Sequence, residues 1–169
     1  SIETHVRDNP KVASRKSLEA LRGFMNKRRV RYGIVGCGQV FEKHGSSLVD
    51  NKTSELRAVF DISSERTNSA ATRFDCEPKG SLADMLNDER IDVINIRTPN
   101  NTHAGLILKT IKAGKHCLSE KPICLTNSEG QEILDNLTNT SSVFVNYQYR
   151  FIPAVRRLIE YCENNTLGR

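Results

Sequence analysis

The sequence contains the run Tyr32-Gly33-Ile34-Val35-Gly36-Cys37-Gly38-Gln39-Val40-Phe41. Its first half has the apolar character of a short buried strand, and its second half opens a stretch that can form a helix. Glycine at position 36 permits the tight turn between them. Glycine at position 38 has no side chain, so a phosphate group can approach the backbone N–H groups at the start of the helix. The run therefore predicts a phosphate-binding loop made by Gly36, Cys37, Gly38, Gln39 and Val40.

Two features weaken the inference of dinucleotide binding from this loop alone. A Gly-x-Gly sequence also occurs in plain tight turns that bind nothing. In addition, Phe41 stands where the dinucleotide-binding pattern has its third glycine, which brings helix and strand close together. We expect Phe41 to alter the packing of the helix while leaving the two phosphate-facing glycines intact.

Outward from the loop, apolar strand-length runs alternate with amphipathic helix-length stretches. Such an alternation is typical of a parallel sheet covered by helices on both faces. We predict strands at 31–35, 56–61, 93–98, 116–119 and 143–147, with a weak one near 77–79. The predicted helices span 39–50, 64–74, 81–88, 102–113, 127–139 and 152–163, and Ser81 is one expected N-cap. The expected fold class is therefore α/β, a doubly wound, mostly parallel Rossmann sheet, whose ligands bind at the carboxyl ends of the strands.

The second predicted strand ends in an acid, Asp61, about 25 residues after the loop. A carboxylate there can accept the hydroxyl groups of an adenosine ribose and would repel a 2′-phosphate, which favours NAD over NADP as the cofactor. Asp61 and its neighbour Ile62 are thus candidate cofactor-binding residues. Ser63, Ser64 and Arg66 lie just beyond and offer contacts to a 2′-phosphate, so NADP is the alternative cofactor. Another interpretation of Asp61 is a turn acid that caps the next helix.

The positive charge of the chain is concentrated at its start. Residues 1–32 hold nine basic and three acidic residues, whereas residues 33–169 hold 16 basic and 17 acidic ones. Because the globular part is neutral, we expect no nucleic-acid partner. Residues 1–29 are predicted to be a basic helical leader with Leu18, Leu21 and Met25 on one face. This leader either links the domain to an upstream partner or lies on its own domain.

The five cysteines are scattered, at positions 37, 76, 117, 124 and 162. Their spacings fit neither a disulfide framework nor a zinc site, so we expect reduced thiols and no metal. No apolar run has the length of a membrane span or the form of a secretory leader. These features predict a cytoplasmic protein without membrane contact. The chain opens with Ser1 and not Met, which leaves room for a preceding segment.

Three stretches further along resemble a known family. They read Arg97-Thr98-Pro99-Asn100-Asn101-Thr102-His103, Ala113-Gly114-Lys115-His116 and Ser119-Glu120-Lys121-Pro122. Together with the glycine loop, they are similar to the N-terminal domain of the glucose–fructose oxidoreductase, inositol dehydrogenase and rhizopine-catabolism (Gfo/Idh/MocA) family. The resemblance runs from about Val30 to Arg169 and predicts one dinucleotide-binding domain over residues 30–169.

The position of these stretches agrees with a cofactor groove. Thr98 ends the predicted strand 93–98, and Pro99 and Asn100 follow it, so all three should line the groove at the carboxyl edge of the sheet. The resemblance implies that Pro99 and Asn100 contact the nicotinamide half of the cofactor. His103 is expected to begin the next helix near the cofactor, with a surface histidine that caps the helix as the alternative.

The resemblance also assigns roles to Glu120 and Lys121. It implies that Lys121 is the catalytic residue, which reaches the nicotinamide ribose and the reacting carbon of the substrate. An ammonium group there would stabilise developing alkoxide charge. Glu120 is implied to contact the cofactor ribose, and the alternative is that it only pairs with Lys121.

Two residues, one at the end of the last predicted strand and one just beyond it, are weaker candidates for the substrate side. Tyr147 and Arg150 could reach the cleft, because that strand should border the place where nicotinamide and substrate meet. The alternatives are that Tyr147 belongs to the core and that Arg150 anchors the passage of the chain into a following domain.

The resemblance implies an oxidoreductase that transfers a hydride between a nicotinamide cofactor and a carbinol carbon of a sugar, polyol or sugar nucleotide. The family has a second, mostly antiparallel domain that forms the substrate pocket, and the Leu167-Gly168-Arg169 ending is similar to the place where that domain begins. We therefore expect this chain to be the cofactor domain of a longer, homo-oligomeric protein and to be inactive alone. The alternative is a regulator that uses the same fold to sense a dinucleotide or a sugar without turnover.

Overall fold

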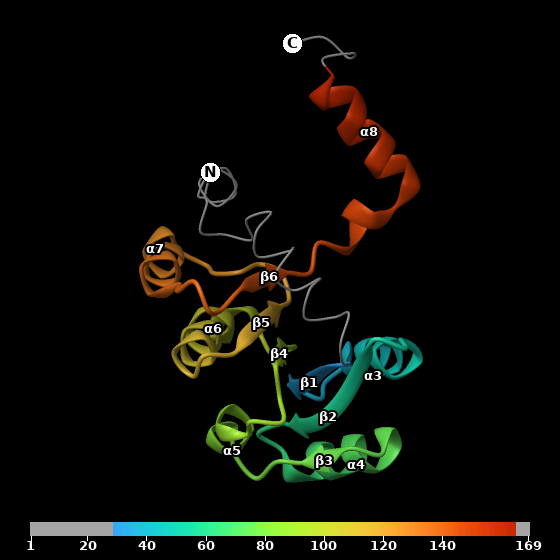
Figure 1. The fold of residues 1–169 in the computed structure, drawn as a ribbon, viewed down its shortest axis with the longest axis vertical. Coiled ribbons are helices and arrows are strands. Elements are labelled where there is room, and N and C mark those ends of the chain that lie inside the picture. The colour runs from blue at the N-terminus through green and yellow to red at the C-terminus, as the bar shows by residue number, and fades with distance from the viewer. Residues whose placement is uncertain (1–28, 165–169) are drawn as a thin grey trace.

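The structure is a computed structural model that describes residues 29–164. The predicted leader, including Leu18, Leu21 and Met25, lies outside the described residues, and so does the Leu167-Gly168-Arg169 ending. Strands and helices alternate along the described part of the chain, as the sequence predicts (Figure 1).

Within residues 29–164, six strands form one sheet in which every pairing is parallel. They are β1 (Val30–Val35), β2 (Ser54–Phe60), β3 (Glu77–Pro78), β4 (Val93–Ile96), β5 (His116–Ser119) and β6 (Val143–Val145). Their order across the sheet is β3-β2-β1-β4-β5-β6. The chain thus winds outward in both directions from the centre, and the doubly wound Rossmann fold is confirmed.

Helices cover both faces of this sheet (Figure 1). They are α3 (Phe41–Asp50), α4 (Ser64–Phe74), α5 (Leu82–Asn87), α6 (His103–Lys112) and α7 (Asn127–Asn136), with a short 3-10 turn η1 (Asn100–Thr102) before α6. The 3-10 turn η2 (Gln148–Phe151) and the helix α8 (Pro153–Glu163) follow β6 and cover neither face. Two apolar clusters fill the layers between helices and sheet. One packs α3 and α4 against β1 and β2, and the other packs α5, α6 and α7 against the opposite face.

The alternation of buried residues explains how the strands serve both layers. Ile34 and Val59 belong to the cluster under α3 and α4, whereas Val35 and Ala58, their neighbours in sequence, belong to the other. Consecutive side chains of a strand point to opposite faces, so a strand in the middle layer must be apolar on both. All four residues of β4 are accordingly buried.

The helix boundaries follow local capping. Ser81 accepts a hydrogen bond from the backbone N–H of Asp84 at 3.1 Å, which confirms the predicted cap of α5. Thr126 and Glu129 form a reciprocal capping box at the start of α7. The carboxyl ends of β4 and β6 come two residues earlier than predicted, because the chain turns into the loops that carry Arg97 and Tyr147.

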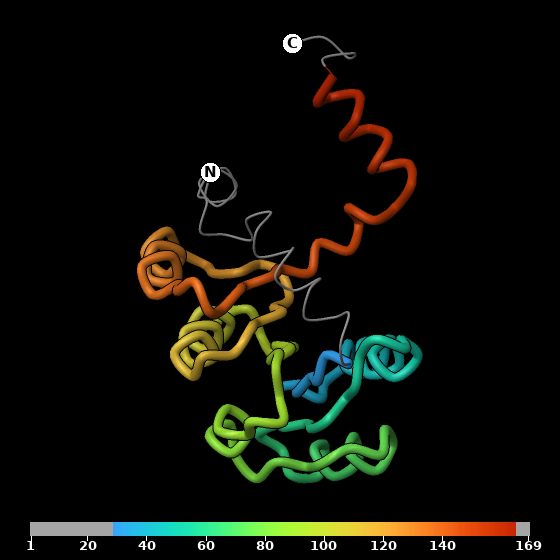
Figure 2. The backbone as a smooth tube through the Cα atoms, viewed as in Figure 1, coloured from blue at the N-terminus to red at the C-terminus, as the bar shows by residue number. Residues whose placement is uncertain are grey.

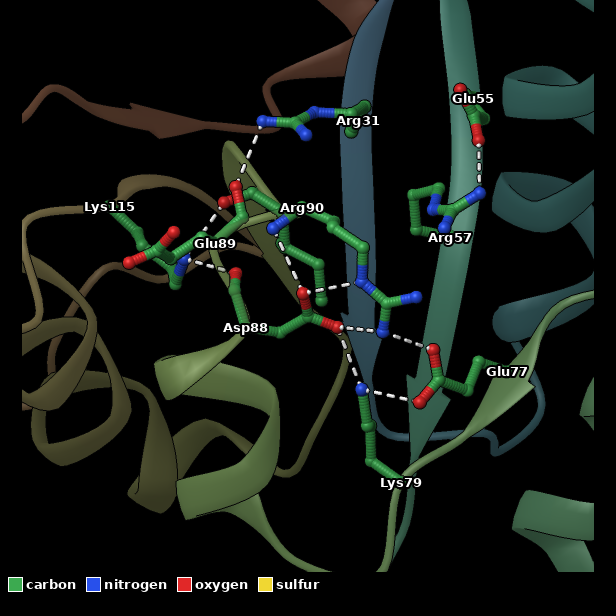
Figure 3. A network of polar contacts seen from close by, with 10 residues as sticks. Arg31, Glu55, Arg57, Glu77, Lys79, Asp88, Glu89, Arg90 and Lys115 are labelled. Atoms are coloured by element: carbon green, nitrogen blue, oxygen red, sulfur yellow. Dashed lines mark hydrogen bonds and ion pairs between the residues drawn. The ribbon is translucent and has the colours of Figure 1, made fainter.

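A network of ion pairs joins β3 to the segment that leads from α5 into β4 (Figure 3). Lys79 and Arg90 both pair with Asp88, whose side chain is buried, at 2.7 and 2.8 Å. Arg31 at the start of β1 pairs with Asp92 at 2.7 Å. Lys115, which precedes β5, donates to the carbonyl oxygens of Asp88 and Ile91 at 2.7 and 2.8 Å. The contacts of Arg31 and Lys115 tie together the amino ends of β1, β4 and β5, whereas Lys79 joins the network from the carboxyl end of β3.

After β6 the chain leaves the sheet through η2 and α8, as the backbone trace shows (Figure 2). No residue of α8 is buried, although its apolar residues are grouped on one side. Of the helices in residues 29–164, none has both the length and the apolar character that crossing a membrane would need.

Candidate functional site

The loop between β1 and α3 has the backbone geometry of a phosphate-binding loop. Gly36 has a φ of +99°, and a Cβ at this position would lie 2.5 Å from the carbonyl oxygen of Arg97. Gly38 is different, because a Cβ there would meet no heavy atom within 4 Å. The loop therefore closes tightly against β4 at Gly36 and leaves open space for a ligand at Gly38. Gln39 and Val40 are exposed beside that space, just before α3 begins.

Phe41, the departure from the dinucleotide-binding pattern, has a packing role. Its ring is buried and meets the ring of Phe74 edge-on, with centroids 5.3 Å apart. One turn later, the backbone of α3 at Gly45 lies close to the Phe74 ring. A Cβ at Gly45 would lie 2.8 Å from this ring. The pair thus joins α3 to α4 and leaves the exposed side of the loop unchanged.

Asp61 follows β2 and is buried, and its carboxylate already accepts several hydrogen bonds. Oδ2 accepts from the backbone N–H of Cys37 at 2.8 Å, which links the acid to the phosphate loop. Oδ1 accepts from the backbone N–H of Ser63 at 2.9 Å and from Nη2 of Arg66 at 2.7 Å. Although burial opposes ionisation, the hydrogen bonds from Arg66, Ser63 and Cys37 hold the pKa of Asp61 below its usual value. The N-cap of α4 is Ser63 and not Asp61, so the alternative capping role was wrong.

A cavity of about 430 Å³ lies beside this acid, at the carboxyl ends of β2 and β3. Asp61, Ile62, Ser64 and Lys79 are among the residues that line it. The Ile62 side chain is 93% exposed, so it offers an apolar surface to whatever enters. The position and size suit the adenosine end of a dinucleotide, since the acid lies where a ribose would be held.

The loop after β4 is tied to the loop after β5 by a histidine. His103, the first residue of α6, has no exposed surface. Its Nε2 lies 2.8 Å from the carbonyl oxygen of Thr98, and its Nδ1 lies 2.7 Å from that of Pro122. The alternative of a histidine on the surface was therefore wrong. His103 is buried and links the loop after β4 to the loop after β5. Pro99 precedes η1, which begins at Asn100.

Glu120 lies at the centre of a polar cluster that comes from four elements. Its Oε1 accepts from Nη1 of Arg97 at 2.5 Å and from Nδ2 of Asn146 at 2.8 Å, and it lies 3.5 Å from Nε2 of His44 in α3. Its Oε2 accepts only from the backbone N–H of Lys121, at 3.2 Å, among the contacts of residues 29–164. The alternative in which Glu120 only pairs with the Lys121 ammonium was wrong.

Lys121 itself is exposed at the carboxyl edge of β5, next to a cis peptide bond to Pro122. Within the described part of the chain, its ammonium group forms no ion pair or side-chain hydrogen bond. It is therefore available to a ligand in the groove.

Tyr147 and Arg150 lie beyond the end of β6, in the segment before α8. Tyr147 is 38% exposed, so it is not a core residue, and Arg150 is exposed on η2. The backbone N–H of Arg150 donates to the carbonyl oxygen of Tyr147 at 3.0 Å. Both lie on the segment that leads away from the sheet toward α8 (Figure 2).

Sequence reasoning missed three residues of this site: His44, Arg97 and Asn146. For Arg97 a signal was available, because a charged residue directly after the buried apolar run of β4 is unusual. His44 and Asn146 gave no such signal. The contact of Asn146 with Glu120 depends on the pairing of β6 with β5, and that of His44 depends on how α3 packs against the sheet.

The fold and the loop geometry define a Rossmann domain whose site lies along the carboxyl ends of its strands. A family model described as "Oxidoreductase family, NAD-binding Rossmann fold" (GFO_IDH_MocA) matches residues 30–148. The chain belongs to this family, as the resemblance in its sequence motifs predicted.

Relatives include sugar and inositol dehydrogenases. Levoglucosan dehydrogenase from Pseudarthrobacter phenanthrenivorans is 32% identical over 115 residues, which are 67% of this chain and 30% of that protein. Inositol 2-dehydrogenase from Rhizobium meliloti is 31% identical over 135 residues, 78% of this chain and 41% of that protein. The chain thus spans less than half the length of these relatives.

A comparison with solved structures also finds dehydrogenases of the same fold. The WlbA dehydrogenase from Bordetella pertussis, crystallised with NADH and UDP-GlcNAcA, superposes with a TM-score of 0.80 at 26% identity. The match covers 85% of this chain and 42% of that one.

Proposed function

We propose that this chain is the cofactor-binding part of a nicotinamide-dependent dehydrogenase. The reaction would move a hydride between the nicotinamide ring and a carbinol carbon of a sugar, polyol or sugar nucleotide. The observation that carries the proposal is the open loop at Gly38, which lies on the same edge of the sheet as the exposed ammonium group of Lys121. Family membership and the dehydrogenases among its relatives support it.

The residues along this edge fit the parts of a dinucleotide. The loop at Gly36, Cys37 and Gly38 would hold the pyrophosphate at the start of α3. The cavity beside Asp61 and Ile62 would take the adenosine.

At the other end of the groove, Thr98, Pro99 and Asn100 would line the nicotinamide half. Glu120 would accept a ribose hydroxyl, and Lys121 would lie at the reacting carbon. When bound, the nicotinamide supplies the hydride acceptor or donor. His103 fixes the two loops relative to each other, through the carbonyl oxygens of Thr98 and Pro122.

The positive charge of Lys121 would stabilise negative charge that develops on the substrate oxygen. Its ammonium group is free of protein anions in residues 29–164, so it can hydrogen-bond to a substrate hydroxyl and stabilise the alkoxide that develops as the hydride moves. Tyr147 and Arg150 would approach from the substrate side.

NAD is the proposed cofactor and NADP the alternative. Asp61 has the right place to accept a ribose hydroxyl, but Arg66 occupies its Oδ1 and must move aside for this. The same arginine could contact a 2′-phosphate, as an arginine does in NADP-binding Rossmann sites.

Two measurements test the proposal. The first is a fluorescence titration of the chain with NADH and NADPH, which should show tighter binding of NADH, and equal or reversed affinities would defeat the role of Asp61. The chain has no tryptophan, so the cofactor signal is free of indole emission.

The second measurement is turnover by the full-length protein with Lys121→Ala, beside Lys112→Ala as the control. Lys112 is an exposed lysine in the last turn of α6, away from the groove. Loss of turnover in Lys121→Ala alone, with cofactor binding retained, is expected. Unchanged turnover would show that Lys121 is not catalytic. The cytoplasmic location and the homo-oligomeric state of the full-length protein stay predictions.

A further inference from the structure

Arg97 is a charged residue enclosed at the bottom of the proposed groove. Its side chain has no exposed surface, and its Nη1 donates to Oε1 of Glu120 at 2.5 Å. Its backbone carbonyl group packs against Gly36 of the phosphate loop, where a Cβ would lie 2.5 Å from the oxygen atom.

Stability does not explain this arginine. Its Nε and Nη2 are buried and find no acceptor within the described part of the chain. An unsatisfied buried donor is costly, and a buried ion pair is often no more stabilising than apolar residues of the same volume. Burial lowers the pKa of the Arg97 guanidinium to about 10, which reflects the same cost. A residue retained at such a cost is a candidate for a role in ligand binding.

The two carboxylate oxygens of Glu120 have different partners. Oε1 is shared by Arg97, Asn146 and His44, all from neighbouring elements of the protein. Oε2 accepts one long hydrogen bond from the backbone of Lys121 and keeps acceptor capacity. Because three side chains hold Oε1, the carboxylate is fixed with Oε2 next to the backbone of Lys121.

We propose that Arg97 is a positioning residue for the nicotinamide half of the cofactor, which acts by holding the Glu120 carboxylate so that Oε2 can accept a ribose hydroxyl. This inference rests on the proposed function. Arg97 also keeps the carboxylate charged. Burial alone would raise the pKa of Glu120, whereas the hydrogen bond from Asn146, the charge of Arg97 and the backbone N–H of Lys121 hold it below its usual value. A charged acceptor binds a hydroxyl more strongly than a neutral one does.

Comparing the binding of two ligands distinguishes a positioning role of Arg97 from a purely structural role. NADH would contact both ends of the groove, whereas ADP lacks the nicotinamide half and would contact only the glycine loop and the cavity at Asp61. We expect Arg97→Met in the full chain to weaken NADH binding by roughly tenfold and to leave ADP binding unchanged. Arg31→Met is the matched control, because it removes a partly buried arginine–aspartate pair at the opposite end of the same strands.

A double-mutant cycle shows whether Arg97 acts through Glu120. In a Glu120→Ala background, Arg97→Met should cost NADH affinity nothing further, since the carboxylate that Arg97 positions is already removed. Arg97→Lys keeps the charge but not the forked geometry, so we expect NADH binding to weaken by about threefold with ADP binding unchanged. If Arg97→Met does not fold, Arg97→Lys carries the test.

The outcomes are distinct. Equal NADH affinity in the unaltered chain and in the Arg97 variant that folds would overturn the inference, and so would a parallel loss of ADP binding or additive effects in the cycle. Failure of the unaltered chain to bind either NADH or NADPH would instead defeat the proposed function.

Discussion

Alanine at Gly36 and, separately, at Gly38 adds the same methyl group at two points of one loop. The surroundings differ sharply. At Gly36 the new Cβ would lie 2.5 Å from the carbonyl oxygen of Arg97 and 2.7 Å from its carbon, with a φ of +99°. At Gly38 it would point into open space. The pair of variants therefore separates the stability of the loop from its capacity to bind phosphate.

The expected magnitudes follow from that geometry. A left-handed conformation costs a residue with a side chain about 1–2 kcal/mol, and the contact with rigid backbone atoms adds a similar amount. Gly36→Ala should therefore lower the free energy of unfolding by about 2–4 kcal/mol and Tm by roughly 5–15 °C. Gly38→Ala should change stability by less than about 1 kcal/mol, with a small gain expected from the less flexible unfolded chain.

Thermal unfolding followed by circular dichroism measures the first effect, and titration with NADH measures the second. We expect Gly38→Ala to weaken NADH binding at least roughly tenfold, because its methyl group stands where the pyrophosphate must approach the backbone. Wild-type NADH affinity in Gly38→Ala, or equal melting temperatures for both variants, would refute this reading of the loop.

Three further changes have clear expected outcomes. Arg66→Ala frees Asp61 and should tighten NADH binding while weakening NADPH binding in paired titrations, and a shift toward NADPH would contradict this. Phe41→Ala removes a buried ring that packs on Phe74 and should cost about 3–5 kcal/mol in urea unfolding, so a loss below about 1 kcal/mol would be against it. Burial and Arg97 lower the pKa of His44 to about 4 from 6.5, so the unfolded chain binds more protons between these values and stability should rise with pH across that window. His44→Gln should flatten the rise, and an unchanged slope would contradict the assignment.

The order of the elements could be predicted because the patterns that encode it are local. The alternation of apolar strand-length runs with amphipathic stretches yields all six strands and the helices between them, and α4 begins and ends at the predicted residues. The boundaries that were missed depend on tertiary contacts. β2, for example, begins at Ser54 because its first residues pair with Val30 and Arg31 of β1.

The site was predictable in its loops and less so in its side-chain partners. Glycine spacing located the phosphate loop, since the turn and the close approach are local requirements of the backbone. The partners of Glu120 were not visible, because Arg97, His44 and Asn146 come from three different elements. The burial of His103 was missed for the same reason, as it depends on the loop that carries Pro122.

Hydrogen exchange of the chain with and without NADH tests most directly whether a dinucleotide binds along the carboxyl edge of the sheet. We expect NADH to slow exchange in four separate segments, at residues 36–41, 61–63, 98–103 and 120–122, and to leave α5 and the amino ends of the strands unchanged. Slower exchange confined to other segments, or no change at saturating NADH, would contradict the proposed site.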